Sequence, residues 1–233
     1  MANTFNIMTL GCKVNQYESE AIEELFIKKG FEKKENDADV YVINTCTVTN
    51  MSDRKSRQMI SRARNDNPEA VVAVMGCYSQ VKPEEVASIE GVDIVLGSRN
   101  KESVVELCTE ALENKGVMDQ VIAASESKTY EELQISNQSE MTRAYIKIQD
   151  GCNMYCSYCL IPYARGNIVS RDIDSIVEET KRLADNGFKE LVLTGIHVAS
   201  YGKDFADDIS LIDVIEAVAS VDGIERIRLS SME

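Results

Sequence analysis

Hydrophobic positions in the first 115 residues follow two alternating periods. Short apolar runs typical of buried strands occupy four segments, 5–10, 40–43, 70–75 and 92–96. Helices are predicted after these runs, over 15–29, 52–65, 83–89 and 101–114, and the first carries Ala21, Ile22, Leu25 and Phe26 at helical spacing. Strands that alternate with helices indicate a parallel sheet with right-handed crossovers. The pattern therefore predicts an α/β domain over residues 1–115, with a flavodoxin-like or Rossmann-like parallel sheet.

A polar segment, 116–141, interrupts the alternation, and we predict an interdomain linker there, with a hairpin around Val121. The alternation then resumes. Strands are predicted over 143–149, 190–193 and 224–229, and helices over 173–185 and 211–218. Three strands are too few to close a barrel of eight units. Residues 142–233 are therefore predicted to form the first part of a (β/α) barrel.

Composition and charge narrow the class of protein. The 233 residues are 44% hydrophobic, which is sufficient for a substantial core. No apolar run reaches about 18 residues and no signal peptide is evident, so we expect a soluble cytoplasmic protein with no membrane partner. The net charge of −14 repels phosphate, so any nucleic-acid contact needs a local basic surface.

Three of the seven cysteines lie within eight residues, in the C-x3-C-x2-C run of Cys152, Cys156 and Cys159. The run follows the first predicted strand of the barrel, at the end where barrel enzymes keep their chemistry. Three thiolates suit a [4Fe-4S] cluster that keeps one iron open. A structural zinc site would need a fourth Cys or His close by, and the next two turns hold none. Inert thiols or a zinc knuckle are the alternative interpretation.

A second set of cysteines is hidden by sequence separation. Cys12, Cys46 and Cys77 each lie just past the carboxyl end of a predicted strand. Because parallel sheets bind ligands outside those ends, we predict that the three thiols meet at one edge as a second metal site. Three unrelated core thiols are the alternative. Cys108 differs, since it lies inside a predicted helix and is expected to be a small buried hydrophobe.

One predicted helix carries a run of cations that includes Arg54, Lys55, Arg57 and Arg62. It begins a few residues after Cys46, so an RNA contact there would flank the second metal site. A solvated helix face explains such a charge run equally well. His197 follows a predicted strand end and is expected to be a polar loop residue without a catalytic role.

Several motifs together resemble the radical S-adenosylmethionine methylthiotransferases. Besides the C-x3-C-x2-C run with Tyr158 before its last cysteine, they are GCKVNQYE at 11–18, NTCTV at 44–48, MGCY at 75–78 and IPYARG at 161–166. The first of these and the terminal RLSSME at 228–233 are most similar to the branch that acts on threonylcarbamoyladenosine in tRNA. The isopentenyladenosine branch is similar but differs at those two places.

The resemblance implies cofactors and roles. Cys152, Cys156 and Cys159 would hold one [4Fe-4S] cluster, whose open iron binds S-adenosyl-L-methionine, and Cys12, Cys46 and Cys77 would hold a second. Thr194 and Gly195 would bind the methionine amino group, and Tyr158 would lie near the adenine. Arg165 and Arg171 would position substrate or a cofactor carboxylate. The clusters and S-adenosylmethionine carry the chemistry, so no protein side chain is assigned as catalytic.

The implied reaction adds a methylthio group to carbon two of N6-threonylcarbamoyladenosine beside the anticodon of tRNA, with an electron donor protein as partner. The family continues through further barrel strands and a β-rich RNA-binding module, so the chain ending at Glu233 is expected to be a C-terminally truncated piece with a radical-SAM partial barrel. Three alternatives stay open: methylthiotransfer to isopentenyladenosine, a non-catalytic iron-sulfur carrier of electrons or sulfur, and an α/β interaction domain with an unstructured second half.

Overall fold

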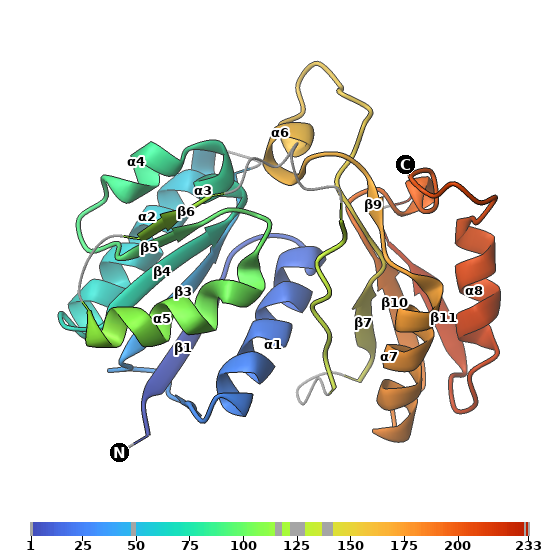
Figure 1. Cartoon of the computed structure of the whole chain (residues 1–233), viewed down its shortest axis with the longest axis horizontal. Coiled ribbons are helices and arrows are strands. Elements are labelled where there is room, and N and C mark those ends of the chain that lie inside the picture. Colours follow the sequence, from blue (N-terminus) through green and yellow to red (C-terminus); the bar gives the residue numbers. More distant parts are fainter. Residues whose placement is uncertain are drawn as a thin grey trace.

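The computed structural model describes residues 2–47, 50–114, 118–121, 129–136, 142–230 and 232. Within them two parallel sheets stand beside each other, each with its own helices (Figure 1). The remaining positions, which include most of the predicted linker and residues 48, 231 and 233 of the quoted motifs, lie outside the described residues. The mixed α/β class predicted from the sequence is confirmed.

The first sheet has six parallel strands in the order β2-β1-β3-β4-β5-β6. Its strands are β1 (Thr4–Thr9), β2 (Glu32–Lys33), β3 (Val40–Thr45), β4 (Val71–Gly76), β5 (Ile94–Leu96) and β6 (Met118–Gln120). The connecting helices are α1 (Lys13–Lys28), α2 (Asn50–Asp66), α3 (Cys77–Val81), α4 (Pro83–Ala87), the 3-10 turn η1 (Lys101–Ser103) and α5 (Val104–Glu113).

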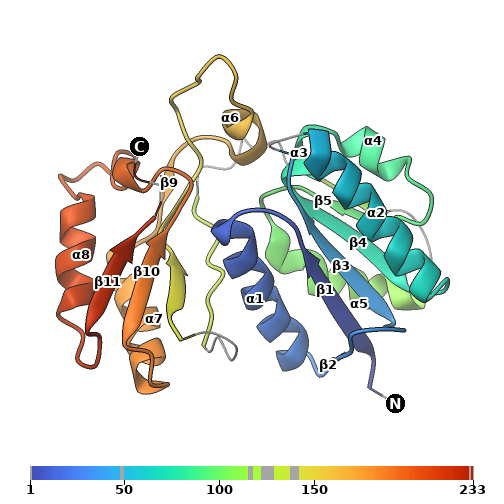
Figure 2. The ribbon, with the colours of Figure 1, turned by 180° about the vertical axis from the view of Figure 1, so that it is seen from behind.

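Side chains of the central strands alternate between two hydrophobic cores, as the period of a strand requires. Val40 and Val42 join a core with α1 and α5, and Tyr41 and Ile43 join one with α2 and α4. Figure 2 shows the same sheet from behind, with α2 lying across it. The helices therefore cover both faces of this sheet, which explains why its strands are continuous apolar runs.

The second sheet has three parallel strands in the order β11-β10-β7. Its strands are β7 (Ala144–Lys147), β10 (Glu190–Thr194) and β11 (Arg226–Leu229), and a short antiparallel pair joins β8 (Gln149–Asp150) to β9 (Val169–Ser170). The helical elements are α6 (Ile161–Arg165), α7 (Ile173–Asp185), the 3-10 turn η2 (Val198–Ser200) and α8 (Leu211–Ala219). Ile176, Leu183, Val214 and Val218 of α7 and α8 pack in one core with this sheet.

The region predicted as a linker departs from expectation. Residues 118–120 form β6, which pairs parallel to β5. The expected hairpin around Val121 depends on residues 122–128, which lie outside the described residues. Farther on, Leu133 and Ile135 are buried against Tyr17 and Ala21 of α1. The composition of this segment is polar, but its few apolar residues are the ones that pack. The domain boundaries at 115 and 142 stay a prediction.

Helix α1 lies between the two sheets, because it contacts β1 on one side and β7 on the other (Figures 1 and 2). In the same region, α3 packs against α6, the short helix that follows the C-x3-C-x2-C run. These contacts bring the carboxyl ends of the two sheets together. Among the described helices, none combines the length and the apolar character that crossing a membrane requires.

Candidate metal centres

The strand-end cysteines lie at one edge of the first sheet, as predicted. Cys12 is the N-cap of α1 after β1, Cys46 follows the last residue of β3, and Cys77 is the first residue of α3 after β4. The three strands are neighbours, with Thr9 opposite Asn44 and Thr45 opposite Gly76. Adjacent parallel strands therefore deliver the three residues to the same rim.

The backbone around these cysteines is tightly packed. A Cβ atom at Gly11 would lie 3.2 Å from the Cβ of Cys46, and one at Gly76 would lie 2.6 Å from the carbonyl oxygen of Thr45. Both glycines have positive φ angles, +136° and +103°. Only glycine allows the chain to turn this closely beside each thiol, which explains why a glycine precedes Cys12 and another precedes Cys77.

Asn15 holds the first two of these loops together. Its Nδ2 donates hydrogen bonds of 2.9 Å to the carbonyl oxygens of both Leu10 and Thr45. Its Oδ1 accepts a hydrogen bond of 3.7 Å from the Cys12 thiol. The side chain is buried, so Asn15 acts as a fixed bracket between the segments that precede Cys12 and Cys46.

The strand-end thiols differ in environment. Cys12 is exposed, whereas Cys46 and Cys77 are buried. Burial raises the pKa of the Cys77 thiol, the neighbouring Arg165 guanidinium opposes that rise, and the charge of Cys12 adds to it. Metal ligation requires thiolates, so a bound cation would reverse the effect of burial.

The strand-end donors are three cysteine thiols. No three Cys, His, Asp or Glu side chains among the described residues are gathered closely enough to hold one metal ion. Three thiols on one rim are the type of ligand that an iron-sulfur cluster takes, and the cluster at this rim stays a prediction.

The C-x3-C-x2-C run forms the loop between β8 and α6, which projects beyond the carboxyl ends of the strands (Figure 1). Its base is fixed, because Cys152 N donates a 3.0 Å hydrogen bond to the carbonyl oxygen of Gly166. At its tip, Cys159 N donates a 2.9 Å hydrogen bond to the carbonyl oxygen of Cys156. Cys156 is exposed, and Cys152 and Cys159 are partly exposed. The thiols are thus accessible to an external ligand.

Two of the three residues expected to bind S-adenosylmethionine lie at the end of β10. Thr194 is buried, and its hydroxyl oxygen accepts a 2.9 Å hydrogen bond from Ser230. Gly195 lies so close to Gln149 that a Cβ there would be 2.9 Å from the Gln149 carbonyl oxygen. Tyr158 is 90% exposed, so its ring stands in solvent. Cofactor roles for these three residues stay a prediction.

Gln149 organises the space between the two strand ends, although no motif in the sequence singled it out. Its Nε2 donates 2.7 Å hydrogen bonds to the carbonyl oxygens of Asp150 and Gly151, at the start of the cysteine loop. Its Oε1 accepts hydrogen bonds from the backbone of Ile196 and His197. The imidazole of His197 is hydrogen-bonded to Ser200 within the same loop. One glutamine therefore ties the loop after β10 to the loop after β8.

A buried charge cluster centred on Glu18 also went unpredicted. Glu18 of α1 lies 2.8 Å from Lys147 Nζ, 3.0 Å from Lys101 Nζ and 2.5 Å from Arg165 Nη1. Asp150 completes it, with its carboxylate 2.7 Å from Lys147 and 3.2 Å from Arg165. All five side chains are at most 1% exposed. Burial alone would raise the pKa of Glu18, but the three cations lower it below its usual range. The sequence signal was a carboxylate on the helix face that also carries Val14 and Ile22.

Arg171 forms a second buried ion pair, with Glu179 of α7. The hydroxyl oxygen of Tyr17 lies within hydrogen-bonding distance of the same carboxylate, at 3.0 Å, and of the carbonyl oxygen of Leu133, at 2.6 Å. In this structure, then, both Arg165 and Arg171 pair with protein carboxylates between the domains, and neither is directed at an open substrate site. Whether they also position substrate or a cofactor carboxylate, as the resemblance implies, stays a prediction.

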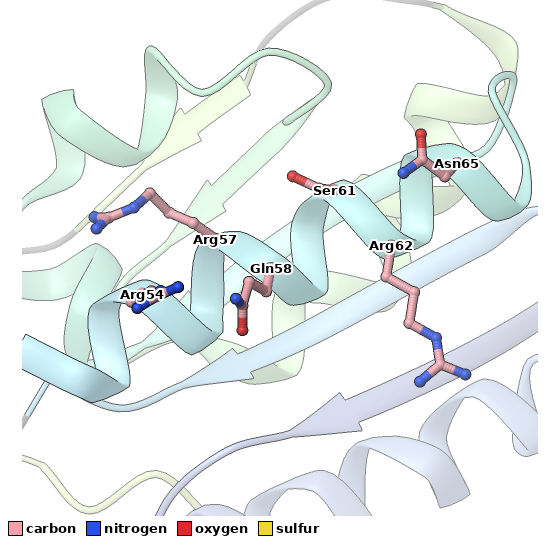
Figure 3. A pocket seen from close by; sticks show the side chains of 6 residues that line it. All are labelled: Arg54, Arg57, Gln58, Ser61, Arg62 and Asn65. Carbon is pink, nitrogen blue, oxygen red and sulfur yellow. The ribbon is translucent and has the colours of Figure 1, made fainter.

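The basic helix is α2, and Figure 3 shows the shallow depression on its exposed face. Arg57 is engaged, because its Nη1 donates to the hydroxyl of Tyr78 at 2.9 Å and to Glu85 at 3.1 Å. Arg54, Lys55 and Arg62 are exposed and have no ion-pair partner among the residues that the structure describes. Arg54 and Arg62 both line this depression (Figure 3).

Comparison with known proteins agrees with this division into two parts. Residues 4–97 match a family model described as "Uncharacterized protein family UPF0004", and residues 146–232 match the radical SAM superfamily. Among solved structures, the radical S-adenosylmethionine methyltransferase TsrM from Kitasatospora setae, with cobalamin and a [4Fe-4S] cluster bound, superposes with a TM-score of 0.60 at 14% identity. The alignment covers 99% of this chain and 59% of that one, and at this identity it speaks only for the fold.

Curated relatives have informative names. The chain is 46% identical to the threonylcarbamoyladenosine tRNA methylthiotransferase MtaB of Bacillus subtilis, over 97% of this chain and 50% of the relative. It is 42% identical to MtaB of Aquifex aeolicus, over 96% and 55%. The tRNA-2-methylthio-N(6)-dimethylallyladenosine synthase of Finegoldia magna is 36% identical, over 97% and 50%. The chain thus spans about half the length of these relatives.

Proposed function

We propose that this chain, which belongs to the radical SAM methylthiotransferase family, takes part in adding a methylthio group to carbon two of N6-threonylcarbamoyladenosine in tRNA. The observation that carries the proposal is the placement of the six cysteines. Two cysteine triads lie at the adjoining carboxyl ends of the two sheets, and α3, which begins at Cys77, packs against α6, which follows Cys159. The names of the relatives at 46% and 42% identity support the substrate.

The exposed triad is suited to the cofactor. When bound at Cys152, Cys156 and Cys159, a [4Fe-4S] cluster with S-adenosyl-L-methionine supplies reductive cleavage of the sulfonium. The chain contributes a loop whose base is held through Cys152 and Gly166. Gln149 fixes the neighbouring loop at Gly195, where the methionine amino group would bind. Exposure of Cys156 leaves that side of the loop open to cofactor and to an electron donor protein.

The second triad has a more sheltered position. Cys46 and Cys77 are buried at the rim of the first sheet, and Cys12 faces outward. We assign to these three thiols a second [4Fe-4S] cluster, which presents or supplies the sulfur. The glycine turns and the Asn15 bracket hold the backbone segments that carry these thiols.

The tRNA contact is assigned to the exposed face of α2. Arg54, Lys55 and Arg62 present cations without ion-pair partners among the described residues, in a chain whose net charge is −14. Phosphate groups bind such isolated arginines readily, and the helix starts four residues after Cys46. Arg57 belongs to the same face, but its guanidinium is already shared with Tyr78 and Glu85. A protein that acts on tRNA is expected in the cytoplasm.

Nucleoside analysis tests the proposal. The anaerobically reconstituted protein is incubated with S-adenosylmethionine, a sulfide source, a reductant and tRNA that carries either N6-threonylcarbamoyladenosine or N6-isopentenyladenosine. We expect the methylthio product only from the first tRNA. Product from the second alone would assign the chain to the dimethylallyladenosine branch, to which relatives at 32–36% identity belong. Loaded clusters without cleavage of S-adenosylmethionine would support a carrier module instead.

A further inference from the structure

Arg165 stands between the two cysteine triads. It is the last residue of α6, six positions after Cys159, and its side chain is completely buried. The next residue, Gly166, accepts the hydrogen bond from Cys152 N that fixes the base of the exposed loop. A movement of Arg165 would therefore be transmitted to the loop that carries Cys152, Cys156 and Cys159.

The guanidinium of Arg165 reaches the first domain at two points. Its Nη2 donates a 2.6 Å hydrogen bond to Oδ1 of Asn15, the same oxygen that accepts from the Cys12 thiol. Its Nη1 lies 2.5 Å from Glu18 Oε1, one turn farther along α1. Through Asn15, Arg165 is connected to the backbone at Leu10 and Thr45, and so to the segments that hold Cys12 and Cys46.

The third strand-end cysteine, Cys77, is connected to Arg165 through helix packing. Helix α3, which Cys77 begins, packs directly against α6. Arg165 is therefore linked through Asn15 to Cys12 and to the segment that precedes Cys46, and through the packing of α6 on α3 to the helix that Cys77 begins.

Arg165 belongs to a buried group of mixed charges. Four cations, Arg99, Lys101, Lys147 and Arg165, meet three carboxylates, Glu18, Glu131 and Asp150. Burial raises the pKa of Glu131 and lowers the pKa of Lys101, so it disfavours the charged form of each. Arg99 is 3% exposed, and its Nε and Nη1 have no hydrogen-bond partner within the described part of the chain. A buried cation without a partner is costly unless an anion balances it, and thiolates bound to a cluster at the strand-end site would supply such an anion.

We propose that Arg165 is the positioning residue that couples the two cysteine triads, holding the strand-end thiols in register with the exposed loop and balancing the charge of the group that they bind. This inference rests on the proposed cluster at Cys12, Cys46 and Cys77. It assigns to Arg165 a role toward the first-domain site, although the residue belongs to the second domain by sequence.

The test uses a background in which only the strand-end site can load, made by replacing Cys152, Cys156 and Cys159 with alanine. In that background, Arg165→Gln and Arg165→Lys are compared with Arg171→Gln. The control removes an equally buried interdomain arginine, but none of the hydrogen bonds or ion pairs that Arg171 makes with described residues reaches Asn15 or Glu18. The readouts are the rate of iron loss to a chelator, the midpoint potential of the cluster and the melting temperature.

We expect Arg165→Gln to lose iron about 10- to 100-fold faster than the background chain, the usual cost of removing a residue that supports metal ligands. Its midpoint potential should fall, because a buried positive charge that favours the added electron is gone. Arg165→Lys keeps the charge but not the two-pronged hydrogen bonding, so it should lose iron faster with a smaller change of potential. Arg171→Gln should lower the melting temperature and leave both cluster readouts unchanged.

Two results would overturn the inference. Iron loss and potential that are unchanged in both Arg165 variants would show that the residue does not support the site. Equal effects from Arg171→Gln would show that any damage to the interface between the domains suffices. A background chain that binds no iron would contradict the second cluster itself, and with it the function proposed above. Because that result differs from an unchanged cluster in the Arg165 variants, failure of the proposed function and failure of this inference can be distinguished. If Arg165→Gln does not fold, Arg165→Lys provides the same comparison.

Discussion

Glu18 and Arg165 form a buried ion pair with a Glu18 Oε1 to Arg165 Nη1 distance of 2.5 Å, although 147 positions separate them in the chain. Lys101 and Lys147 also lie within 3.0 Å of the same carboxylate. The interface between the two domains therefore depends on a carboxylate that faces three cations in a fully buried site.

Removal of that carboxylate should be strongly destabilising. In Glu18→Gln, three buried cations lose their shared partner, so we expect the free energy of unfolding to fall by about 3–5 kcal/mol. Denaturant unfolding measures the change. The matched control is Glu225→Gln, which breaks an exposed pair with Lys189 at 2.6 Å and should leave stability nearly unchanged. Equal effects in the two variants would contradict the central role of the buried pair.

The same carboxylate predicts a direction of pH dependence. Lys101, Lys147 and Arg165 lower the pKa of Glu18 from 4.5, against burial and the charge of Asp150. A lowered pKa contributes stability that is present above pH 4.5 and is lost as the pH falls below it toward the folded-state value. The melting temperature of the wild type should therefore decline below pH 4.5 more steeply than that of Glu18→Gln. If the melting temperatures of the two proteins decline equally as the pH falls, Glu18 does not contribute this pH-dependent stability.

The glycine before Cys77 offers a test of the strand-end site. In Gly76→Ala, the new Cβ would lie 2.6 Å from the Thr45 carbonyl oxygen, at a φ angle of +103°. We expect a loss of about 1–3 kcal/mol in stability and reduced iron binding at the strand-end triad, because Cys77 must shift.

Gly30→Ala is the matched control for that substitution. Gly30 also has a positive φ, +94°, but a Cβ there meets nothing within 4 Å. It should lose some stability through backbone strain and keep its iron. Full iron binding in Gly76→Ala would contradict the placement of Cys77 in the site.

The exposed face of α2 predicts a salt-dependent effect on tRNA binding. In Arg54→Glu/Arg62→Glu, we expect weaker binding and a slope of log affinity against log salt that is smaller by about two, one for each phosphate that the protein no longer neutralises. The control is Lys28→Glu/Lys29→Glu, which makes the same change of net charge at the exposed end of α1. Identical losses of affinity in the two double variants would mean that only net charge matters.

The sequence predicted the fold where one physical signal dominated. The buried runs such as 40–43 and 70–75 are apolar on both faces and are bounded by glycine or polar residues. Their assignment as buried parallel strands, and the sheet edge that their carboxyl ends form, therefore followed directly from the sequence. The positions of Cys12, Cys46 and Cys77 at that edge needed only the rule for parallel strands. The short strand β6 was missed because its three residues, Met118 to Gln120, carry no alternation.

The interface between the domains was missed for a different reason. Glu18, Lys101, Lys147 and Arg165 are charged, and a charged residue is ordinarily predicted to be exposed. Each of these side chains can be buried only together with the others, because Glu18 pairs with the three cations. The four residues come from four segments of the chain that no local sequence pattern connects. Arg165 and Arg171 were therefore expected at a substrate, whereas the structure uses them between the domains.

The most direct test of two cysteine-bound clusters is iron and sulfide analysis after anaerobic reconstitution. Two cubane clusters require about eight irons per chain in the wild type, and about four in each of two variants in which one triad, Cys12, Cys46 and Cys77 or Cys152, Cys156 and Cys159, is replaced by alanine. Zinc in place of iron, or about four irons in the wild type and in the strand-end variant alike, would contradict the assignment of two clusters.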